Sequence, residues 1–196
     1  MPLNNILLYT DDNIIGQSIH DYLSDIHQDI TQASYQDIVQ GGVAPLAETV
    51  IFNMIHKDIS AADTVVLLNK LRFHFSRCTL LVLMVKSDIA NLCRELIDLE
   101  NLLILTEKSS LDAFSAITRT QDETPQTRYL RTQRKLTARE LQVLELIIAC
   151  NNNKRIASLL NIDHKTVHSH RIHIMKKLGM NSSQVMHKQI VNMNHC

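Results

Sequence analysis

The sequence is poor in aromatic residues and in glycine. Its 196 residues include no Trp, four Phe, four Tyr and four Gly. Nucleotide bases stack on aromatic side chains, so this composition argues against a nucleotide-binding module. No apolar run approaches the roughly eighteen residues that a membrane-spanning helix needs. The cysteines, at positions 78, 93, 150 and 196, match no CxxC or zinc-finger spacing, so we expect them to be buried or unused thiols in a reducing compartment.

The sequence also lacks a signal-peptide pattern and the motifs of catalytic or cofactor sites. The first residues, MPLNNILLYTDD, contain acids where a signal peptide has a basic start and a longer apolar stretch. We therefore expect a cytoplasmic protein with no membrane partner. The sequence also has no nucleophile–base pair, no Gly-rich phosphate loop and no cluster of metal ligands, so we expect neither an enzyme nor a cofactor.

Charge is divided unequally along the chain. Residues 1–125 contain 8 Lys and Arg against 17 Asp and Glu, whereas residues 126–196 contain 12 against 3, and the total is zero. A basic module joined to an acidic one indicates that the C-terminal part meets a polyanion and the N-terminal part does not.

Residues 1–120 alternate between short apolar runs and segments with helical spacing. The expected strands are 6–9, 30–35, 49–54, 80–85 and 102–105, with 30–35 the weakest. The expected helices are 14–26, 61–75, 89–100 and 111–117. Strands that alternate with helices predict right-handed crossovers and a parallel sheet. The fold class is therefore an α/β doubly wound five-stranded domain, in which Gly41, Gly42 and Pro45 predict a loop at 36–48.

Residues 121–135 are polar, contain one proline and lack an apolar period, as expected for a linker. Helical patterns fill the rest of the chain, 136–196, at 136–149, 152–160, 163–178 and 182–193. Thr137 and Glu140 form a capping-box pattern at the start of the first helix. An Asn at the start of 152–160 and Asp163 at the start of 163–178 are placed to cap these two helices. The tight turn between the two helices predicts a helix-turn-helix.

Four histidines, at 164, 168, 170 and 173, suggest a metal site at first. On a helix, His164 and His168 share one face, but His170 and His173 lie roughly 240° and 180° away from His164. The four imidazoles cannot converge on one ion, and a closed tetrahedral zinc site needs four ligands. We therefore expect no metal here.

The C-terminal region resembles the LuxR/NarL-type DNA-binding domain over residues 136–193. The resemblance is carried by KLTARELQVLELI, NKRIASLLNI and KTVHSHRIHIMKKLGM, which follow the LTxRE, IAxxL and TVxxHxxxIxxKL motifs in order. It implies an all-α four-helix domain in which 163–178 is the recognition helix in the major groove of double-stranded promoter DNA. It also implies that 182–193 forms dimers.

The helical wheel gives the recognition helix two faces. Val167, Ile174 and Leu178 form an apolar stripe for burial, with Met175 at its margin. The opposite face remains for DNA, and the resemblance implies base contacts by His168, Ser169 and Ile172. Its implied phosphate contacts are Lys165, Thr166, Lys176 and Lys177, with His170 between the core and a phosphate. Many relatives carry Lys or Arg at position 168, so we expect weaker autonomous DNA binding that increases at mildly acidic pH.

The N-terminal domain resembles the receiver of response regulators. That resemblance implies a Mg²⁺-binding acidic pair, matched by Asp11 and Asp12. The same two residues are equally typical of a turn and a helix cap. At the end of the third strand, however, Asn53 occupies the phosphoacceptor position, and an amide cannot form an acyl phosphate. Met84 or Val85 replaces the receiver's Ser or Thr, and Thr106, Glu107 or Lys108 lies at the lysine position.

A receiver without its acceptor, joined to this kind of helix-turn-helix, is similar to auxiliary regulators of the RcsA and BglJ type. The resemblance implies a phosphorylation-independent regulator, acting as a homodimer or as a heterodimer with an RcsB-like response regulator. An anti-activator that captures another regulator without reading DNA is the alternative. Receivers of this family often cover the recognition helix, and the opposite charges favour such a dock. The full-length protein would then bind DNA more weakly than residues 126–196.

Overall fold

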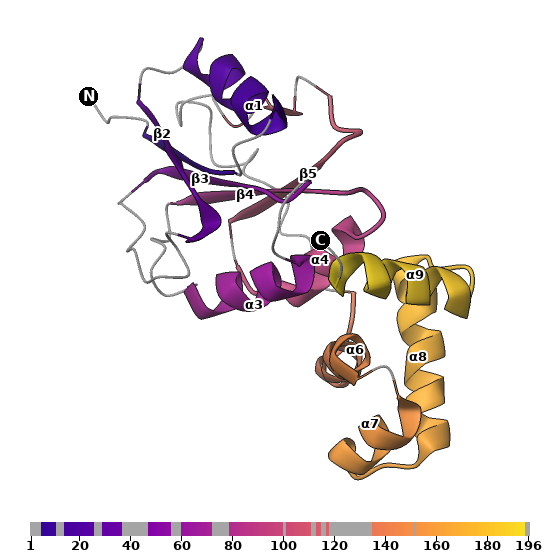
Figure 1. Ribbon diagram of the computed structural model, residues 1–196. Helices are drawn as coiled ribbons and strands as arrows, with labels where there is room; N and C mark the ends of the chain where they lie inside the picture. Colours follow the sequence, from indigo (N-terminus) through magenta and orange to yellow (C-terminus); the bar gives the residue numbers. More distant parts are fainter. Residues whose placement is uncertain are drawn as a thin grey trace.

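The structure is a computed structural model with two domains side by side (Figure 1). It describes residues 5–10, 14–25, 29–36, 47–55, 60–71, 79–99, 101–110, 113–114, 117, 135–150 and 152–194. Among these residues, no helix is long and apolar enough to cross a membrane.

The N-terminal domain is built on a five-stranded parallel sheet with the order β2-β1-β3-β4-β5. The central strands are buried along their length because helices cover both faces, and this explains their continuous apolar runs. The strands are β1 (Ile6–Tyr9), β2 (Ile30–Ala33), β3 (Thr49–Asn53), β4 (Leu80–Val85) and β5 (Leu102–Thr106). The predicted doubly wound fold is confirmed.

The two faces of the sheet have separate cores. Helix α1 (Ile14–Ser24) covers one face, where Ile19 and Leu23 pack with Leu8 and Ile51. Helices α3 (Ala61–Leu71) and α4 (Ala90–Leu96) cover the other, as Figure 1 shows. The core on this second side continues into the C-terminal domain without a break. The two domains therefore share an apolar junction.

Helix α4 is shorter than the predicted 89–100. Ile97 is extended, with φ −85° and ψ 125°. Asn69 of α3 closes the end of α4, because its Nδ2 donates to the Leu96 carbonyl at 2.9 Å and its Oδ1 accepts from the Asp98 N–H at 2.8 Å. This contact from a neighbouring helix ends a segment whose periodicity would have allowed it to continue. Most of the loop predicted at 36–48 lies outside the described residues, as do the end of the predicted helix 61–75 and most of 111–117.

The C-terminal domain contains α6 (Ala138–Cys150), α7 (Asn153–Leu160), α8 (His164–Leu178) and α9 (Ser183–Asn194). All three predicted caps are present. Thr137 and Glu140 form the capping box, the Asn152 side chain accepts from the Lys154 N–H at 2.9 Å, and Asp163 accepts from the Lys165 N–H at 2.7 Å. Asn161 adopts a left-handed conformation, with φ 51°, in the turn between α7 and α8.

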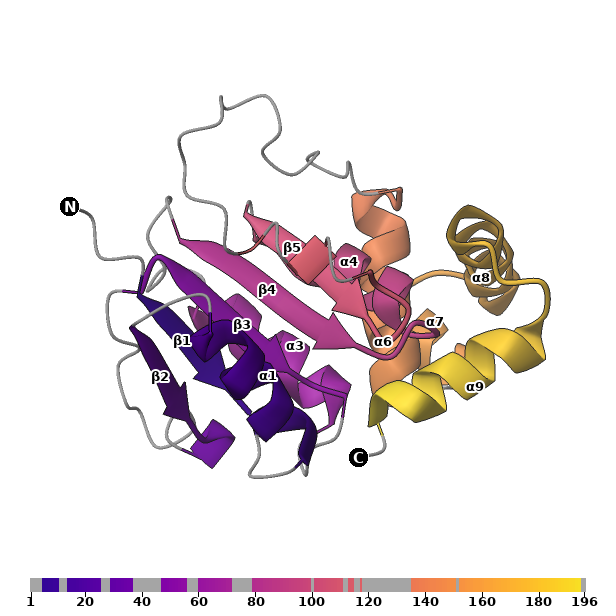
Figure 2. The ribbon, with the colours of Figure 1, turned by 90° about the horizontal axis from the view of Figure 1, so that it is seen from above.

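The domains meet through α3 and α4. Helix α9 lies against α3, and α6 lies against α4. Figure 2 shows the C-terminal helices to one side of the sheet, beyond β5. The predicted linker, 121–135, lies outside the described residues except for Lys135, which belongs to the junction.

Candidate nucleic-acid interface

Helix α8 has defined ends and a fixed buried side. Asp163 caps its start, and Gly179 ends it with φ 72°, a left-handed conformation that glycine adopts without strain. Val167 and Ile174 are fully buried, and Leu178 is nearly so. This confirms the predicted apolar stripe. Because the stripe packs on α6 and α7, the opposite side of α8 is turned outward.

The outward side of α8 carries most of the predicted DNA contacts. The exposed residues are Lys165, Thr166, His168, Ser169, Ile172 and Lys176. Ile172, which is 45% exposed, places an apolar side chain on this otherwise polar face. The Ser169 hydroxyl donates to the Lys165 carbonyl at 3.1 Å, so its oxygen lone pairs remain able to accept from a base. A basic face with short polar and apolar side chains suits a groove of DNA.

The histidines of α8 do not converge. His164, His168 and His173 are exposed, and His170 is half-buried. Within the described parts of the chain, no group of three or more His, Cys, Asp or Glu side chains could hold a metal ion. His170 lies at the edge between the core and the outward side, the place predicted for a residue that reaches both.

Lys177 differs from the other predicted phosphate contacts because it is engaged inside the domain. Its Nζ pairs with Glu140 Oε2 at 2.5 Å, and the side chains are 35% and 6% exposed. The same oxygen accepts from the Thr137 N–H at 2.8 Å and from the Thr137 hydroxyl at 3.0 Å. Burial raises the pKa of Glu140, but the hydrogen bonds from Lys177 and Thr137 outweigh it and set the pKa at about 2. The ion pair joins α6 to the last turn of α8.

Two arginines that the sequence reasoning missed hold α7 in place. Arg171 is half-buried in α8, and its Nη1 donates to Asn153 Oδ1 at 3.0 Å. Burial lowers the pKa of Arg171. Arg139 of α6 donates to the Leu160 carbonyl at the other end of α7, at 3.1 Å. Helical periodicity could have identified Arg171, because it places this residue between the outward face of α8 and the buried face.

The junction between the domains leaves the outward side of α8 open. Asn192 of α9 donates to Asp88 Oδ2 at 2.5 Å, and the Glu95 carboxylate of α4 accepts from the N–H groups of Lys135 and Leu136. The expectation that the acidic domain covers the recognition helix is therefore wrong for this arrangement. Hydrophobic packing on α3 and α4 determines the dock, and the opposite net charges of the two domains do not bring the basic face inward.

The position of the receiver's phosphoacceptor is closed. The Asn53 side chain is fully buried, its Nδ2 donates to Thr10 Oγ1 at 3.0 Å, and its Oδ1 accepts from the Ile55 N–H at 3.2 Å. The Tyr35 hydroxyl donates to the Asn53 carbonyl at 2.5 Å. Asp11 and Asp12, the acidic pair that the receiver resemblance implies, lie outside the described residues. Asn53 therefore has a packing role here.

The ends of β4 and β5 also differ from a receiver. Met84 and Val85 are buried, and Val85 pairs with Thr106. Beyond the strands, the Glu107 carboxylate accepts from the Ser87 hydroxyl at 2.6 Å and from the Ser87 N–H at 2.8 Å. The Ser87 hydrogen bond lowers the pKa of Glu107, against a smaller effect of burial. An anion thus lies near the place where the receiver resemblance implies a lysine.

Comparison with known proteins identifies the C-terminal domain. Residues 134–188 match the family described as bacterial regulatory proteins, luxR family. The chain is 40% identical over 62 residues to the transcriptional regulatory protein TdiR of Thauera aromatica, which is 31% of this chain and 27% of TdiR. It is 42% identical over 62 residues to the uncharacterized response regulatory protein YgeK of Escherichia coli, which is 32% of this chain and 42% of YgeK. These matches span less than half of either relative.

Solved structures extend the likeness to both domains. RcsB of Salmonella enterica serovar Typhimurium, bound to a promoter in the presence of a phosphomimetic, matches 96% of this chain and 98% of its own, with a TM-score of 0.52 and 19% identity. A structure of two RcsB dimers on two parallel DNAs has the same coverage, a TM-score of 0.55 and 17% identity. At this identity the likeness shows the fold. The chain therefore shares the fold of RcsB over both domains, and its residues 134–188 match the luxR family.

Proposed function

We propose that the protein is a DNA-binding transcriptional regulator that reads promoter DNA with α8. The observation that carries the proposal is the outward side of α8, which is basic and exposed while the opposite side of the same helix is packed on α6 and α7. In this proposal His168, Ser169 and Ile172 contact base edges, and Ile172 packs on a thymine methyl group. Lys165, Thr166 and Lys176 hold phosphates, and His170 reaches a phosphate from the edge of the core.

Lys177 has a different part in the proposal. Its ammonium already has a carboxylate partner, and a phosphate would have to displace Glu140, which is buried and retains its charge to low pH. We therefore assign Lys177 mainly to holding α8 in position. Phosphate contact by Lys177 remains a prediction from the family resemblance.

We also propose that regulation does not depend on phosphorylation of this chain. An amide at position 53 cannot form an acyl phosphate, and the buried contacts of Asn53 leave its side chain no freedom to act. Control then comes from dimer choice, either a homodimer or a heterodimer with an RcsB-like response regulator. Mass spectrometry after incubation with acetyl phosphate should find no phosphorylated residue, and a modified Asp11 or Asp12 would contradict this part.

Charge reversal tests the DNA contact. Lys165→Glu combined with Lys176→Glu should abolish DNA retention in a mobility-shift assay, because each lysine contributes to counterion release. Lys70→Glu with Lys108→Glu is the matched control, since both lysines are exposed in the other domain and the net charge changes equally. Equal loss of binding in both variants, or no loss in the first, would contradict the proposal and favour the alternative, an interaction protein that does not read DNA.

A further inference from the structure

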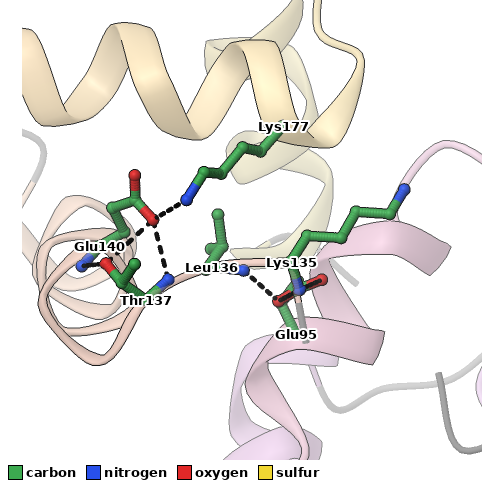
Figure 3. A network of polar contacts seen from close by, with 6 residues as sticks. All are labelled: Glu95, Lys135, Leu136, Thr137, Glu140 and Lys177. Carbon is green, nitrogen blue, oxygen red and sulfur yellow. Dashed lines mark hydrogen bonds and ion pairs between the residues drawn. The ribbon is translucent and has the colours of Figure 1, made fainter. Parts of the chain in front are cut away.

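We propose that Glu95 of the receiver-like domain is a positioning residue for α8, an inference that rests on the proposed function. A series of polar contacts leads from the Glu95 carboxylate to Lys177 in the last turn of α8 (Figure 3). The series passes through the first residues of the C-terminal domain and through the capping box of α6. It joins the acidic domain to the helix that is proposed to read DNA.

The first contact crosses the domain junction. Glu95 is 2% exposed, and its two carboxylate oxygens accept from the backbone N–H of Lys135 at 2.9 and 3.0 Å. Oε2 also accepts from the Leu136 N–H at 3.1 Å. A buried carboxylate needs hydrogen-bond donors, and here the donors are backbone groups at the start of the other domain. Their position is therefore fixed by where Glu95 lies.

Glu95 itself lies on a rigid support. It belongs to the last turn of α4, and Asn69 of α3 holds that turn through the Leu96 carbonyl and the Asp98 N–H. The flanking side chains, Leu96 and Ile97, are buried in the core that continues into the C-terminal domain. The carboxylate thus has little room to follow a displaced partner.

The second contact passes along α6. Leu136 directly precedes Thr137, whose N–H and hydroxyl donate to Glu140, while the Glu140 N–H donates back to the Thr137 hydroxyl at 3.3 Å. Glu140 is 5% exposed and pairs with Lys177. A shift of residues 135–136 would move the first turn of α6, and with it the carboxylate that anchors α8.

Because α8 is one continuous helix, its anchor affects every base contact at once. A displaced last turn would alter how His168, Ser169 and Ile172 meet the bases, and these contacts determine sequence preference. Lysine contacts to phosphate tolerate small displacements because they are long and flexible. Loss of the Glu95 contact should therefore reduce the preference for specific DNA and leave the salt dependence of binding unchanged.

The contacts can be tested without DNA. In ¹H–¹⁵N spectra of the full-length protein, Glu95→Gln should shift the amide signals of 135–140 and also those of 174–178 in α8. Glutamine keeps one oxygen that can accept from these N–H groups, but it also places an N–H₂ group against the Lys135 N–H and removes the charge, so the contact is weakened while the volume is kept. Glu145→Gln, which removes a charge from the exposed side of α6, is the control and should leave 174–178 unshifted. Shifts confined to 90–99 and 135–137 would overturn the proposal.

A second variant changes the α8 end of the same series of contacts. Lys177→Met should shift the amide signals of 135–136 and 94–97 in the receiver-like domain, and unshifted signals there would overturn the proposal. This measurement decides the matter even if Glu95→Gln does not fold.

DNA binding gives the functional readout. Glu95→Gln should lower the ratio of specific to nonspecific affinity by roughly three- to tenfold, as residues that couple distant sites do. The combination with Lys177→Met should lower it no further than the larger single effect, because both act through one series of contacts. Additive losses, or an unchanged ratio in Glu95→Gln, would overturn the proposal. If the unaltered protein binds no DNA, the proposed function fails, whereas the amide shifts still decide whether Glu95 positions α8.

Discussion

Replacing Glu140 with glutamine should remove a pH-dependent part of the free energy of unfolding. The pKa of Glu140 is lowered from its ordinary 4.5 to about 2 in the folded protein. Since one pKa unit corresponds to about 1.36 kcal/mol, a shift of this size corresponds to about 3 kcal/mol. The Lys177 side chain is 35% exposed, so solvent screening reduces the expected contribution to roughly 2 kcal/mol.

The sign follows from the direction of the shift. In the unfolded chain Glu140 binds a proton below its ordinary pKa of 4.5, whereas in the folded protein it remains ionised to about pH 2. The stabilisation is therefore complete above the unfolded value and is lost as the pH falls towards 2. The difference in stability between the unaltered protein and Glu140→Gln should shrink by roughly 2 kcal/mol over that interval.

Urea unfolding followed by circular dichroism at pH 6, 5, 4 and 3 measures this difference. Subtracting the variant from the unaltered protein isolates Glu140 from the other carboxylates that titrate in the same range. Glu145→Gln is the matched control on the exposed side of α6 and should show a much smaller change. A difference between the unaltered protein and Glu140→Gln that stays constant from pH 6 to pH 3 would refute the reasoning.

Three further changes test other contacts by urea unfolding. Arg171→Met should cost about 1 kcal/mol because Asn153 loses a charged donor, and a stability equal to that of the unaltered protein would contradict this contact. Asn53→Asp should cost about 1–3 kcal/mol, since the donor to Thr10 is lost and a carboxylate is buried; a stabilised variant would contradict the packing role of Asn53. Asn192→Asp should destabilise more than Asn192→Ala because a second carboxylate would face Asp88, and equal losses would argue against that contact.

Local patterns were sufficient to predict the described elements and most of their ends, with the end of α4 as an exception because Asn69 of α3 determines it. The continuous apolar runs of β3 and β4 reflect burial on both faces of a parallel sheet, and the caps at Thr137, Asn152 and Asp163 depend on residues within a few positions of one another. The two faces of α8 follow from helical periodicity in the same way. Its exposed side was predicted residue by residue, with Lys177 the exception because its partner lies on another helix.

Contacts between distant parts of the chain could not be predicted from these patterns. Glu95 reads as one more acid on an amphipathic helix, and only the fold brings it against the N–H groups of Lys135 and Leu136. Net charge also misled, because it suggested that the acidic domain covers the basic face. The two domains instead pack through apolar surfaces of α3 and α4, which contact α6 and α9. The apolar periodicity of α6 and α9 does not show whether a residue packs inside its own domain or against the other domain.

The most direct test of the central claim is selection of genomic DNA fragments by the full-length protein alone near physiological salt, followed by sequencing. A few related sites should be enriched, and Lys165→Glu combined with Lys176→Glu should lose the enrichment. Recovery of the same fragments by both proteins, without a shared sequence, would contradict the claim that α8 reads DNA.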